Sequence, residues 1–258
     1  MLCSFPRSGR SWLRFMLACY LDEHLGLGVG VDFHTIFQLI PNRGGDPQRG
    51  APAYRFRERA DVPFVIADHS PFGPAIAGAP VILMIRSPLD TLVSAYFYHT
   101  RRTQRFTGTL PEFLRDRELG APALVDYMNG WEERLARPEL LALSYEQLHA
   151  DTTGTLARVL EFLEVEVNAA AVARAVDAAG FENMRAMELR SGPLDEAIRP
   201  EPGAPQALRA RAGEVGGYRG HLTPEDTQAV IDYCSQKLGA RVKALFAEMV
   251  VMGTSVKR

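Results

Sequence analysis

The sequence predicts an α/β fold, in which a P-loop-like parallel sheet of about four to five strands is flanked by helices on both faces. Two apolar runs, at residues 64–67 and 81–85, are bounded by prolines and are typical of parallel strands buried on both faces. Segments with helical periodicity alternate with such runs, as in a parallel sheet covered by helices. Because 258 residues with 47% hydrophobic content are enough for one large core, we expect a single domain over residues 1–258.

The first elements are expected to be a short strand, a tight basic loop and an apolar helix. The strand takes residues 2–5, and Gly26, Gly28 and Gly30 follow the end of the helix. Residues 41–61 are rich in Pro, Gly and Arg, a composition that is typical of a surface excursion between elements.

Caps and helical periodicity mark the later elements. Ser87 and Pro88 are typical of an N-cap and a first helical position, so a helix is expected to begin after the second apolar run. Thr223 and Pro224 signal another helix start, and this last helix is expected to end near Lys237. The remaining clear elements are one strand and two amphipathic helices, at residues 140–143, 152–163 and 168–179.

The composition argues against several classes of protein. With 29 Lys and Arg against 31 Asp and Glu, a net charge of -2 does not favour a broad nucleic-acid surface. The 3 cysteines lack metal-ligand spacing, and an odd number suits a reducing compartment. No apolar run of about 18 residues is present, so no membrane span is expected. We expect a cytoplasmic protein that binds neither membranes nor nucleic acids, and the oligomeric state stays open.

The most informative segment is residues 4–12, Ser-Phe-Pro-Arg-Ser-Gly-Arg-Ser-Trp, between the first strand and the first helix. Such a loop directs backbone N–H groups, hydroxyls and the guanidinium groups of Arg7 and Arg10 to one point, and the helix N-terminus adds positive potential. These features predict an anion cradle, most often for phosphate. The usual kinase loop needs a lysine and a metal-binding hydroxyl after its second glycine, and this segment has one glycine and no lysine.

Polar side chains follow three of the expected strands. The first strand leads into the loop at Arg7, the second into His69, and the third into Arg86. Because ligands bind beyond the carboxyl ends of parallel strands, we expect these groups to gather at one edge of the sheet. Ser94 lies about two helical turns beyond Ser87, which predicts a second anion site made of Arg86 and Ser94. A ligand that spans Arg7 and Arg86 needs two separated phosphate groups, which the contiguous triphosphate of ATP fits less well.

Together these motifs resemble the family of sulfotransferases that use 3′-phosphoadenosine 5′-phosphosulfate (PAPS). Residues 4–12 are similar to the family's 5′-phosphosulfate loop, T-Y-P-K-S-G-T-T-W, and residues 86–96 to its 3′-phosphate motif, R-N-P-x-D-x-x-V-S-x-Y. Residues 68–71 take the place of the segment with the family's catalytic histidine. Residues 145–148 resemble Y-E-D-L, and residues 211–218 resemble R-K-G-x-x-G-D-W. The matches follow the family's order along the chain.

The resemblance implies in-line transfer of a sulfuryl group from PAPS to a hydroxyl or amine of a small-molecule acceptor, without a metal. His69 is implied to be the base, and Arg7 to neutralise charge on the sulfuryl oxygens, while adenosine 3′,5′-bisphosphate (PAP) leaves. The residues implied to bind the 5′-phosphosulfate are Arg7, Ser8, Gly9, Arg10 and Ser11. Those implied at the 3′-phosphate are Arg86, Ser94, Arg211, the neighbouring Ala212 and the backbone of Gly213. Those implied around the adenine are Trp12 and Phe181, with Tyr145 nearby.

Departures from the family motifs change the expected chemistry. Arg7 stands in place of a lysine, and a guanidinium clamps charge but does not give up a proton. Arg10 replaces a small hydroxyl residue and is expected either to add a second clamp or to reach an acidic acceptor. Ala212 replaces a lysine, which leaves the expected 3′-phosphate site less positive.

Two other functions stay open from the sequence alone. An ATP-dependent small-molecule kinase on a related P-loop fold is one, although the missing lysine and metal-binding hydroxyl count against it. A nucleotide-binding protein without turnover is the other. His69, Trp12 and Tyr145 also have plainer interpretations, as a structural histidine, a core residue and a strand-end tyrosine. The acceptor cannot be read from the sequence, and its pocket is expected to come from residues 32–60, 97–130 and 190–215.

Overall fold

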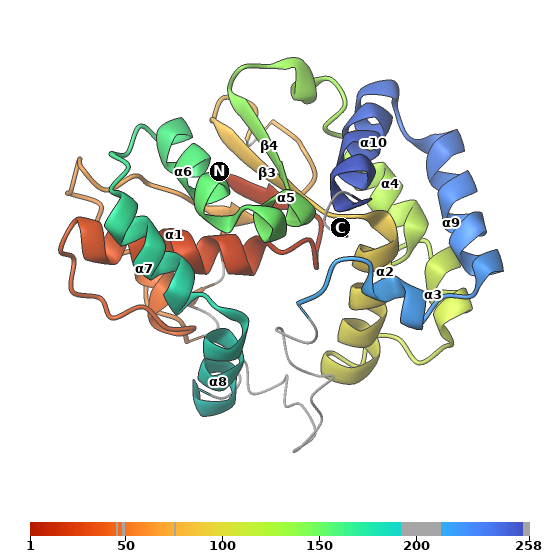
Figure 1. Cartoon of the computed structure of the whole chain (residues 1–258), viewed down its shortest axis with the longest axis horizontal. Helices are drawn as coiled ribbons and strands as arrows, with labels where there is room; N and C mark the ends of the chain where they lie inside the picture. Colours follow the sequence, from red (N-terminus) through yellow and green to blue (C-terminus); the bar gives the residue numbers. More distant parts are fainter. Residues whose placement is uncertain (45, 48–49, 75, 192–212, 255–258) are drawn as a thin grey trace. The chain divides into compact units, whose positions relative to one another are not determined.

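A four-stranded sheet carries the fold in this computed structural model, which describes residues 1–258 except 45, 48–49, 75, 192–212 and 255–258 (Figure 1). The strands are β1 (Leu2–Ser4), β2 (Ala67–Asp68), β3 (Val81–Ile85) and β4 (Leu140–Ser144), in the order β2-β1-β3-β4. β3 and β4 pair in parallel, with Val81 opposite Leu140. The predicted α/β fold, a parallel sheet flanked by helices, is confirmed at the lower end of the expected strand number.

The strand expected at residues 64–67 is much shorter than predicted and is shifted along the chain. Only Ala67–Asp68 form β2. The N–H of Val65 donates to the carbonyl oxygen of Pro63 at 3.1 Å, a local turn that takes this donor away from any neighbouring strand. Phe64 is 58% exposed, and its ring packs 4.6 Å from that of Tyr54. The apolar run therefore does not continue as a buried strand.

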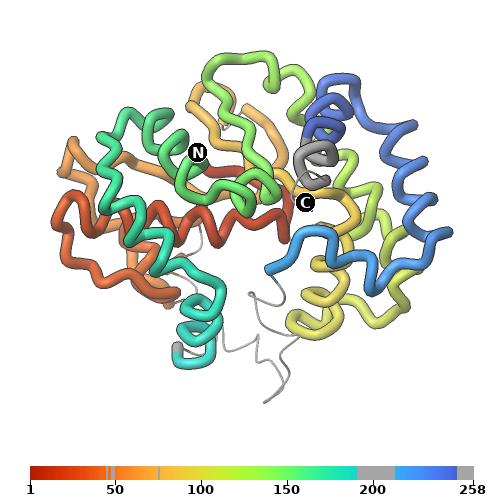
Figure 2. The backbone as a smooth tube through the Cα atoms, viewed as in Figure 1, coloured from red at the N-terminus to blue at the C-terminus, as the bar shows by residue number. Residues whose placement is uncertain are grey.

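Two compact units make up the chain. The first comprises Met1–Leu2, Arg10–Asp68 and Asp151–Arg211, and the second comprises Cys3–Gly9, His69–Ala150 and Ala212–Arg258. Each unit thus combines three separate stretches of the sequence. Figure 2 colours the backbone by position along the chain. The expectation of a single domain over residues 1–258 stays a prediction.

Helix packing dominates the first unit. Its elements are α1 (Arg10–His24), η1 (Thr35–Gln38), α6 (Thr152–Phe162), α7 (Ala169–Ala178) and α8 (Phe181–Ser191), together with β2. α1 lies against α6 and α7, and it buries Leu13, Leu17 and Leu21, which recur every fourth residue on one helix face. Asn168 caps α7, since its side chain accepts a hydrogen bond from the N–H of Ala171. The two amphipathic helices predicted here are therefore confirmed.

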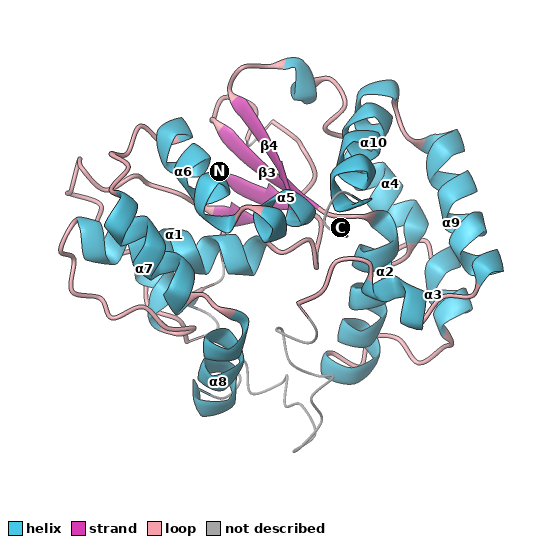
Figure 3. Ribbon diagram, in the orientation of Figure 1, coloured by secondary structure: helices cyan, strands magenta, loops and turns pink. Residues whose placement is uncertain are grey.

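The second unit is built around α2. Its other helical elements are η3 (Tyr98–Arg102), α3 (Leu110–Arg115), α4 (Ala121–Asn129), η4 (Arg134–Ala136), α5 (Tyr145–Ala150), η6 (Gly217–Gly220), α9 (Pro224–Lys237) and α10 (Ala240–Thr254). α2 (Pro88–Phe97) contacts η3, α3, α4, η6 and α9, because residues 89–95 are all buried. α5 lies against β4, and α10 lies against α5 (Figure 3). Among the described residues, no helix is both long and apolar enough to cross a membrane.

Candidate active site

The loop that follows β1 curls tightly in the second unit. Arg7 adopts φ 72°, in the left-handed region that residues with a Cβ rarely occupy, and such outliers cluster at functional sites. Gly9 adopts φ 91°, and a Cβ there would lie 2.5 Å from Cδ2 of Tyr145. The loop therefore requires glycine at position 9 for its backbone conformation and for its close approach to Tyr145. Ser8, between them, is buried.

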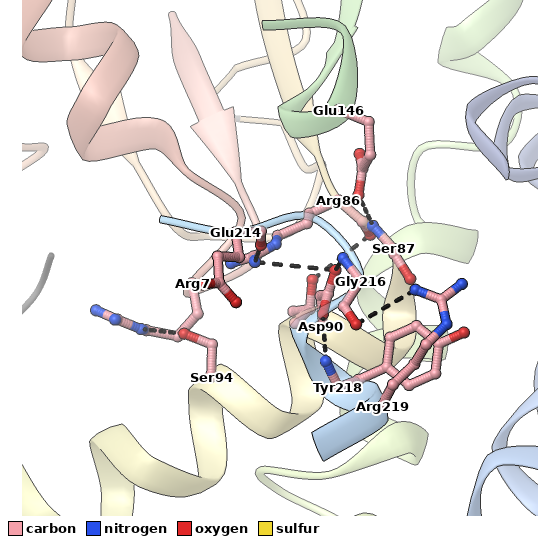
Figure 4. A network of polar contacts seen from close by, with 11 residues as sticks. Arg7, Arg86, Ser87, Asp90, Ser94, Glu146, Glu214, Gly216, Tyr218 and Arg219 are labelled. Atoms are coloured by element: carbon pink, nitrogen blue, oxygen red, sulfur yellow. Dashed lines mark hydrogen bonds and ion pairs between the residues drawn. The ribbon is translucent and has the colours of Figure 1, made fainter. Parts of the chain in front are cut away.

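Arg7 is attached to α2. Its Nε donates a hydrogen bond of 3.1 Å to Oγ of Ser94, which is buried on that helix (Figure 4). Its guanidinium carbon lies 5.1 Å from the ring centre of Tyr98. The loop and the predicted second anion site are thus in direct contact within one unit. The sequence predicted both sites but not this hydrogen bond between them.

Arg86 follows β3 and is held on two sides. Its guanidinium carbon lies 4.2 Å above the ring centre of Tyr145, and its Nη2 donates 2.8 Å to the carbonyl oxygen of Glu214. The same Nη2 lies 3.9 Å from Oδ2 of Asp90. Its Nε is buried and has no hydrogen-bond partner among the described residues. Arg86 is therefore an oriented cation, and an oriented guanidinium suits the recognition of an oxyanion.

Tyr145 supports both Gly9 and Arg86. It is the first residue of α5, directly after β4, and its ring contacts the loop on one side and the guanidinium on the other. Burial raises the pKa of its hydroxyl, so Tyr145 stays neutral. The expectation that Tyr145 lies near the adenine stays a prediction, and the contacts described associate it with Arg86.

Ser87 occupies the N-cap position of α2, as predicted, but its hydroxyl makes no capping hydrogen bond. Its N–H instead donates 3.0 Å to Oε1 of Glu146, so a carboxylate on α5 fixes the turn that carries Arg86. Glu146 is buried, and this burial raises the pKa of its carboxyl. The predicted N-cap position is therefore confirmed, whereas the contact with Glu146, 59 residues away, has no local sequence signal.

Asp90, which sequence reasoning left without a role, joins a distant segment to α2. Its Oδ2 accepts 2.7 Å from the N–H of Gly216, and its Oδ1 accepts 2.9 Å from the N–H of Tyr218 (Figure 4). Asp90 is only 4% exposed, and Gly216 adopts φ 78°. The only sequence signal for Asp90 is its place in the motif that surrounds Arg86.

His69 is exposed and is oriented from β1. Its Nδ1 lies 2.8 Å from the carbonyl oxygen of Ser4, and a carbonyl only accepts. Nδ1 therefore carries the proton in the neutral ring, and Nε2 is left as the acceptor. The carboxylate next to His69 in the sequence, that of Asp68, pairs with Arg43 at 3.0 Å. The backbone of Ser4 orients the imidazole instead, a contact that no motif encodes.

The predicted residues of the first unit lie at the beginning of α1 and near α8. Nε1 of Trp12 donates 2.9 Å to the carbonyl oxygen of Ala179, two residues before Phe181. The structure thus joins Trp12 to the turn that precedes Phe181, and their expected role at the adenine stays a prediction. Arg10 is buried and Ser11 is exposed, both in the first turn of α1. Arg211 and Ala212 lie outside the described residues, whereas Gly213 is described and adopts φ 65°.

The second unit therefore combines two held arginines, the buried hydroxyls of Ser8 and Ser94, and the imidazole of His69, whose Nδ1 is bonded to a backbone carbonyl. Guanidinium and hydroxyl groups are the types that bind oxyanions, and an imidazole is a type of group that accepts a proton. Within the described part of the chain, no group of three or more His, Cys, Asp or Glu residues is arranged to hold a metal ion.

Comparisons with known proteins give a consistent result. A family model described as "Sulfotransferase domain" matches residues 1–241. Cytosolic sulfotransferase 15 of Arabidopsis thaliana is 26% identical over 267 residues, which cover 93% of this chain and 71% of that protein. 3-alpha-Hydroxysteroid sulfotransferase of Cavia porcellus is 23% identical, covering 95% of this chain and 85% of the relative.

Two solved structures share the fold. Mouse sulfotransferase SULT7A1 complexed with PAP has a TM-score of 0.67 at 21% identity, with 96% of this chain and 87% of that chain covered. Retinol dehydratase in a complex with retinol and PAP has a TM-score of 0.69 at 16% identity, with 93% and 80% covered.

Proposed function

Because this chain belongs to the sulfotransferase family, we propose that it transfers a sulfuryl group from PAPS to a hydroxyl or amine of a small-molecule acceptor. The observation that carries the proposal is that Arg7 and Arg86 are both attached to α2, one through Ser94 and the other through Asp90. Two cations that contact the same helix suit a ligand with two separated anionic groups. PAP, which is present in both solved relatives, has this character.

PAPS supplies the activated sulfuryl group, and the residues of this chain bind and orient it. Its 5′-phosphosulfate is assigned to the loop and the first turn of α1, that is, to Arg7, Ser8, Gly9, Arg10 and Ser11. The 3′-phosphate is assigned to Arg86, Ser94 and the backbone of Gly213, with Arg211 and Ala212 next to it in sequence. Trp12 and Phe181 are assigned to the adenine.

His69 is the proposed base. With Nδ1 bonded to the Ser4 carbonyl oxygen, Nε2 is the nitrogen that takes the proton from the acceptor hydroxyl or amine. A positioned base of this kind contributes about 10²–10⁴-fold to the rate. Arg7 balances negative charge on the transferred group but donates no proton, because a guanidinium stays ionised at working pH. Positioning and charge stabilisation then supply most of the remaining acceleration, as in phosphoryl transfer.

A thermal-shift experiment tests the proposal without knowledge of the acceptor. PAP is expected to raise the melting temperature of the protein, whereas ATP with Mg²⁺ raises it much less. The opposite order would favour the small-molecule kinase. Turnover of PAPS with a panel of phenols, alcohols and amines then identifies the acceptor class, and binding of PAP without any turnover would favour a nucleotide-binding protein.

A further inference from the structure

The carboxylate of Asp90 holds residues 216–218 against α2 with two hydrogen bonds. Each oxygen accepts one backbone N–H, from Gly216 at 2.7 Å and from Tyr218 at 2.9 Å. Two bonds to alternate residues fix the orientation of the segment as well as its distance from the helix. Gly216 itself adopts φ 78°, in the left-handed region that favours glycine.

Asp90 is available for this contact because the backbone N–H that it would usually accept is bonded to another carboxylate. An acidic side chain at the third residue of a helix commonly bonds back to the N–H of the N-cap residue. Asp90 is the third residue of α2, but the N–H of Ser87 already donates to Oε1 of Glu146. Both oxygens of Asp90 are therefore directed to the segment at 216–218.

The same segment is also bonded to Arg86. The carbonyl oxygen of Glu214 accepts 2.8 Å from Nη2 of Arg86, and that Nη2 lies 3.9 Å from Oδ2 of Asp90. Arg86, Glu214, Gly216 and Asp90 thus form a closed ring of contacts between α2 and the segment (Figure 4). Movement of the segment would remove one of the two groups that orient the guanidinium.

We propose that Asp90 is a positioning residue for the 3′-phosphate site, an inference that rests on the proposed function. By holding residues 213–218 beside Arg86, Asp90 keeps the backbone of Gly213 and the Arg86 guanidinium directed to the same phosphate group. Asp90 does not itself contact the ligand. Its contribution is to restrict two donors that come from distant parts of the sequence.

A purely electrostatic role for Asp90 predicts the opposite sign. A carboxylate next to an anion site repels the ligand, so its neutralisation would tighten binding. Positioning predicts weaker binding instead. Asn keeps one acceptor oxygen but turns an N–H₂ group toward the second backbone N–H, whereas Ala removes both acceptors. The positioning role therefore predicts a graded loss, larger for Asp90→Ala than for Asp90→Asn.

The test compares PAP with adenosine 5′-monophosphate, which lacks the 3′-phosphate, by isothermal titration calorimetry. The ratio of the two affinities is expected to fall about tenfold in Asp90→Asn and further in Asp90→Ala, since a hydrogen bond to a charged group contributes about this much. Affinity for the monophosphate is expected to stay within about twofold, because it does not use this site.

Glu132→Gln is the matched control. Glu132 also accepts two backbone N–H groups, from Arg241 at 2.8 Å and Val242 at 3.1 Å, but it bonds to no residue of the proposed site. This variant is expected to leave the affinity ratio unchanged. If Asp90→Ala does not fold, Asp90→Asn carries the test.

An unchanged or increased ratio in the Asp90 variants would overturn the positioning role. A wild-type protein that does not prefer PAP over the monophosphate would overturn the proposed function instead, and with it the premise of this inference. The two failures are therefore distinguishable.

Discussion

Two carboxylates in the second unit, those of Asp90 and Glu132, each accept hydrogen bonds from two backbone N–H groups. Asp90 accepts the N–H groups of Gly216 and Tyr218 at the start of η6, and Glu132 accepts those of Arg241 and Val242 at the start of α10. The first N–H groups of any helix lack partners within the helix, and an anion there is favoured by the helix dipole. Both contacts therefore stabilise a helix start from outside it.

The difference lies in the neighbours of the two carboxylates. Nη2 of Arg86 lies 3.9 Å from Asp90 and bonds to the same segment that Asp90 holds. The backbone acceptors and donors around Glu132 belong to the junction of α9 and α10, where Asn129 also bonds to Lys237 and Gly239. Two similar hydrogen-bond patterns thus differ in the cation beside them, and this cation is the reason that we propose a role in ligand geometry for Asp90 alone.

Among these variants, His69→Ala is expected to have the largest effect on activity. We expect kcat to fall by about 10²–10⁴-fold with PAP affinity unchanged, because the imidazole takes a proton and does not hold the nucleotide. Steady-state kinetics with calorimetry of PAP checks this. His24→Ala, which removes an imidazole at the end of α1, is the control and is expected to retain kcat. A His69→Ala enzyme with unchanged kcat would exclude the proposed base.

Arg86→Ala removes the cation that distinguishes Asp90 from Glu132. PAP affinity is expected to fall about 100-fold, since charged and bidentate hydrogen bonds are lost together. In the Arg86→Ala background, Asp90→Asn is expected to lower PAP affinity by no more than about twofold, because the guanidinium that Asp90 positions is no longer there. Calorimetry of the four proteins completes this double-mutant cycle. Additive losses would show that the two residues act independently.

Glu132→Gln measures what such a contact contributes to stability alone. The free energy of unfolding is expected to fall by about 1 kcal/mol, because one of two acceptors for the α10 N-terminus is lost. For a chain of this size, that corresponds to a melting temperature lower by about 2–4 °C. Calorimetry of the apo protein measures this shift. An equally large loss of PAP affinity would remove the distinction between the two carboxylates.

Glu146→Gln has the smallest expected effect, and its sign depends on pH. Burial raises the pKa of the Glu146 carboxyl above its ordinary value of 4.5, so the folded protein holds this proton more tightly than the unfolded chain does. The contribution of this carboxyl to the stability of the wild-type protein is therefore lost as the pH rises from its ordinary pKa through its raised pKa in the fold. Gln keeps the acceptor for the Ser87 N–H and carries no titrating proton.

We expect the melting temperature of Glu146→Gln relative to wild type to increase between pH 4 and pH 7, by less than about 4 °C. Thermal melts of both proteins in matched buffers measure the difference. A decrease over this range would show that the ionised carboxylate is stabilised in the fold.

Sequence patterns predicted correctly those elements that depend on neighbouring residues, such as apolar runs and N-caps. β3 is a continuous apolar run, and the side chain of Thr223 caps α9 by accepting 3.1 Å from the N–H of Asp226. The strand expected at 64–67 was wrong in extent, because the Pro63 carbonyl takes the Val65 N–H. The family resemblance drawn from the sequence motifs is confirmed by the match over residues 1–241.

The contacts that complete the candidate site join residues far apart in sequence. Asp90 and Gly216 are separated by 126 positions, and Ser4 and His69 by 65. Periodicity and motif spacing report on neighbours along the chain, so neither contact has a sequence signature. Residue types at the site were therefore predictable, whereas the groups that orient them required the fold.

Arg7 also has a consequence for any attempt to make this protein more heat-resistant. An L-residue at φ 72° costs the fold on the order of 1 kcal/mol, and glycine would remove that cost. Selection for thermal tolerance alone would replace the guanidinium wherever this gain exceeds the loss of its hydrogen bond to Ser94 and its contact with Tyr98. Selection for thermal stability and selection for turnover would therefore favour different residues at position 7. A library of stabilised variants is best built with Arg7 unchanged.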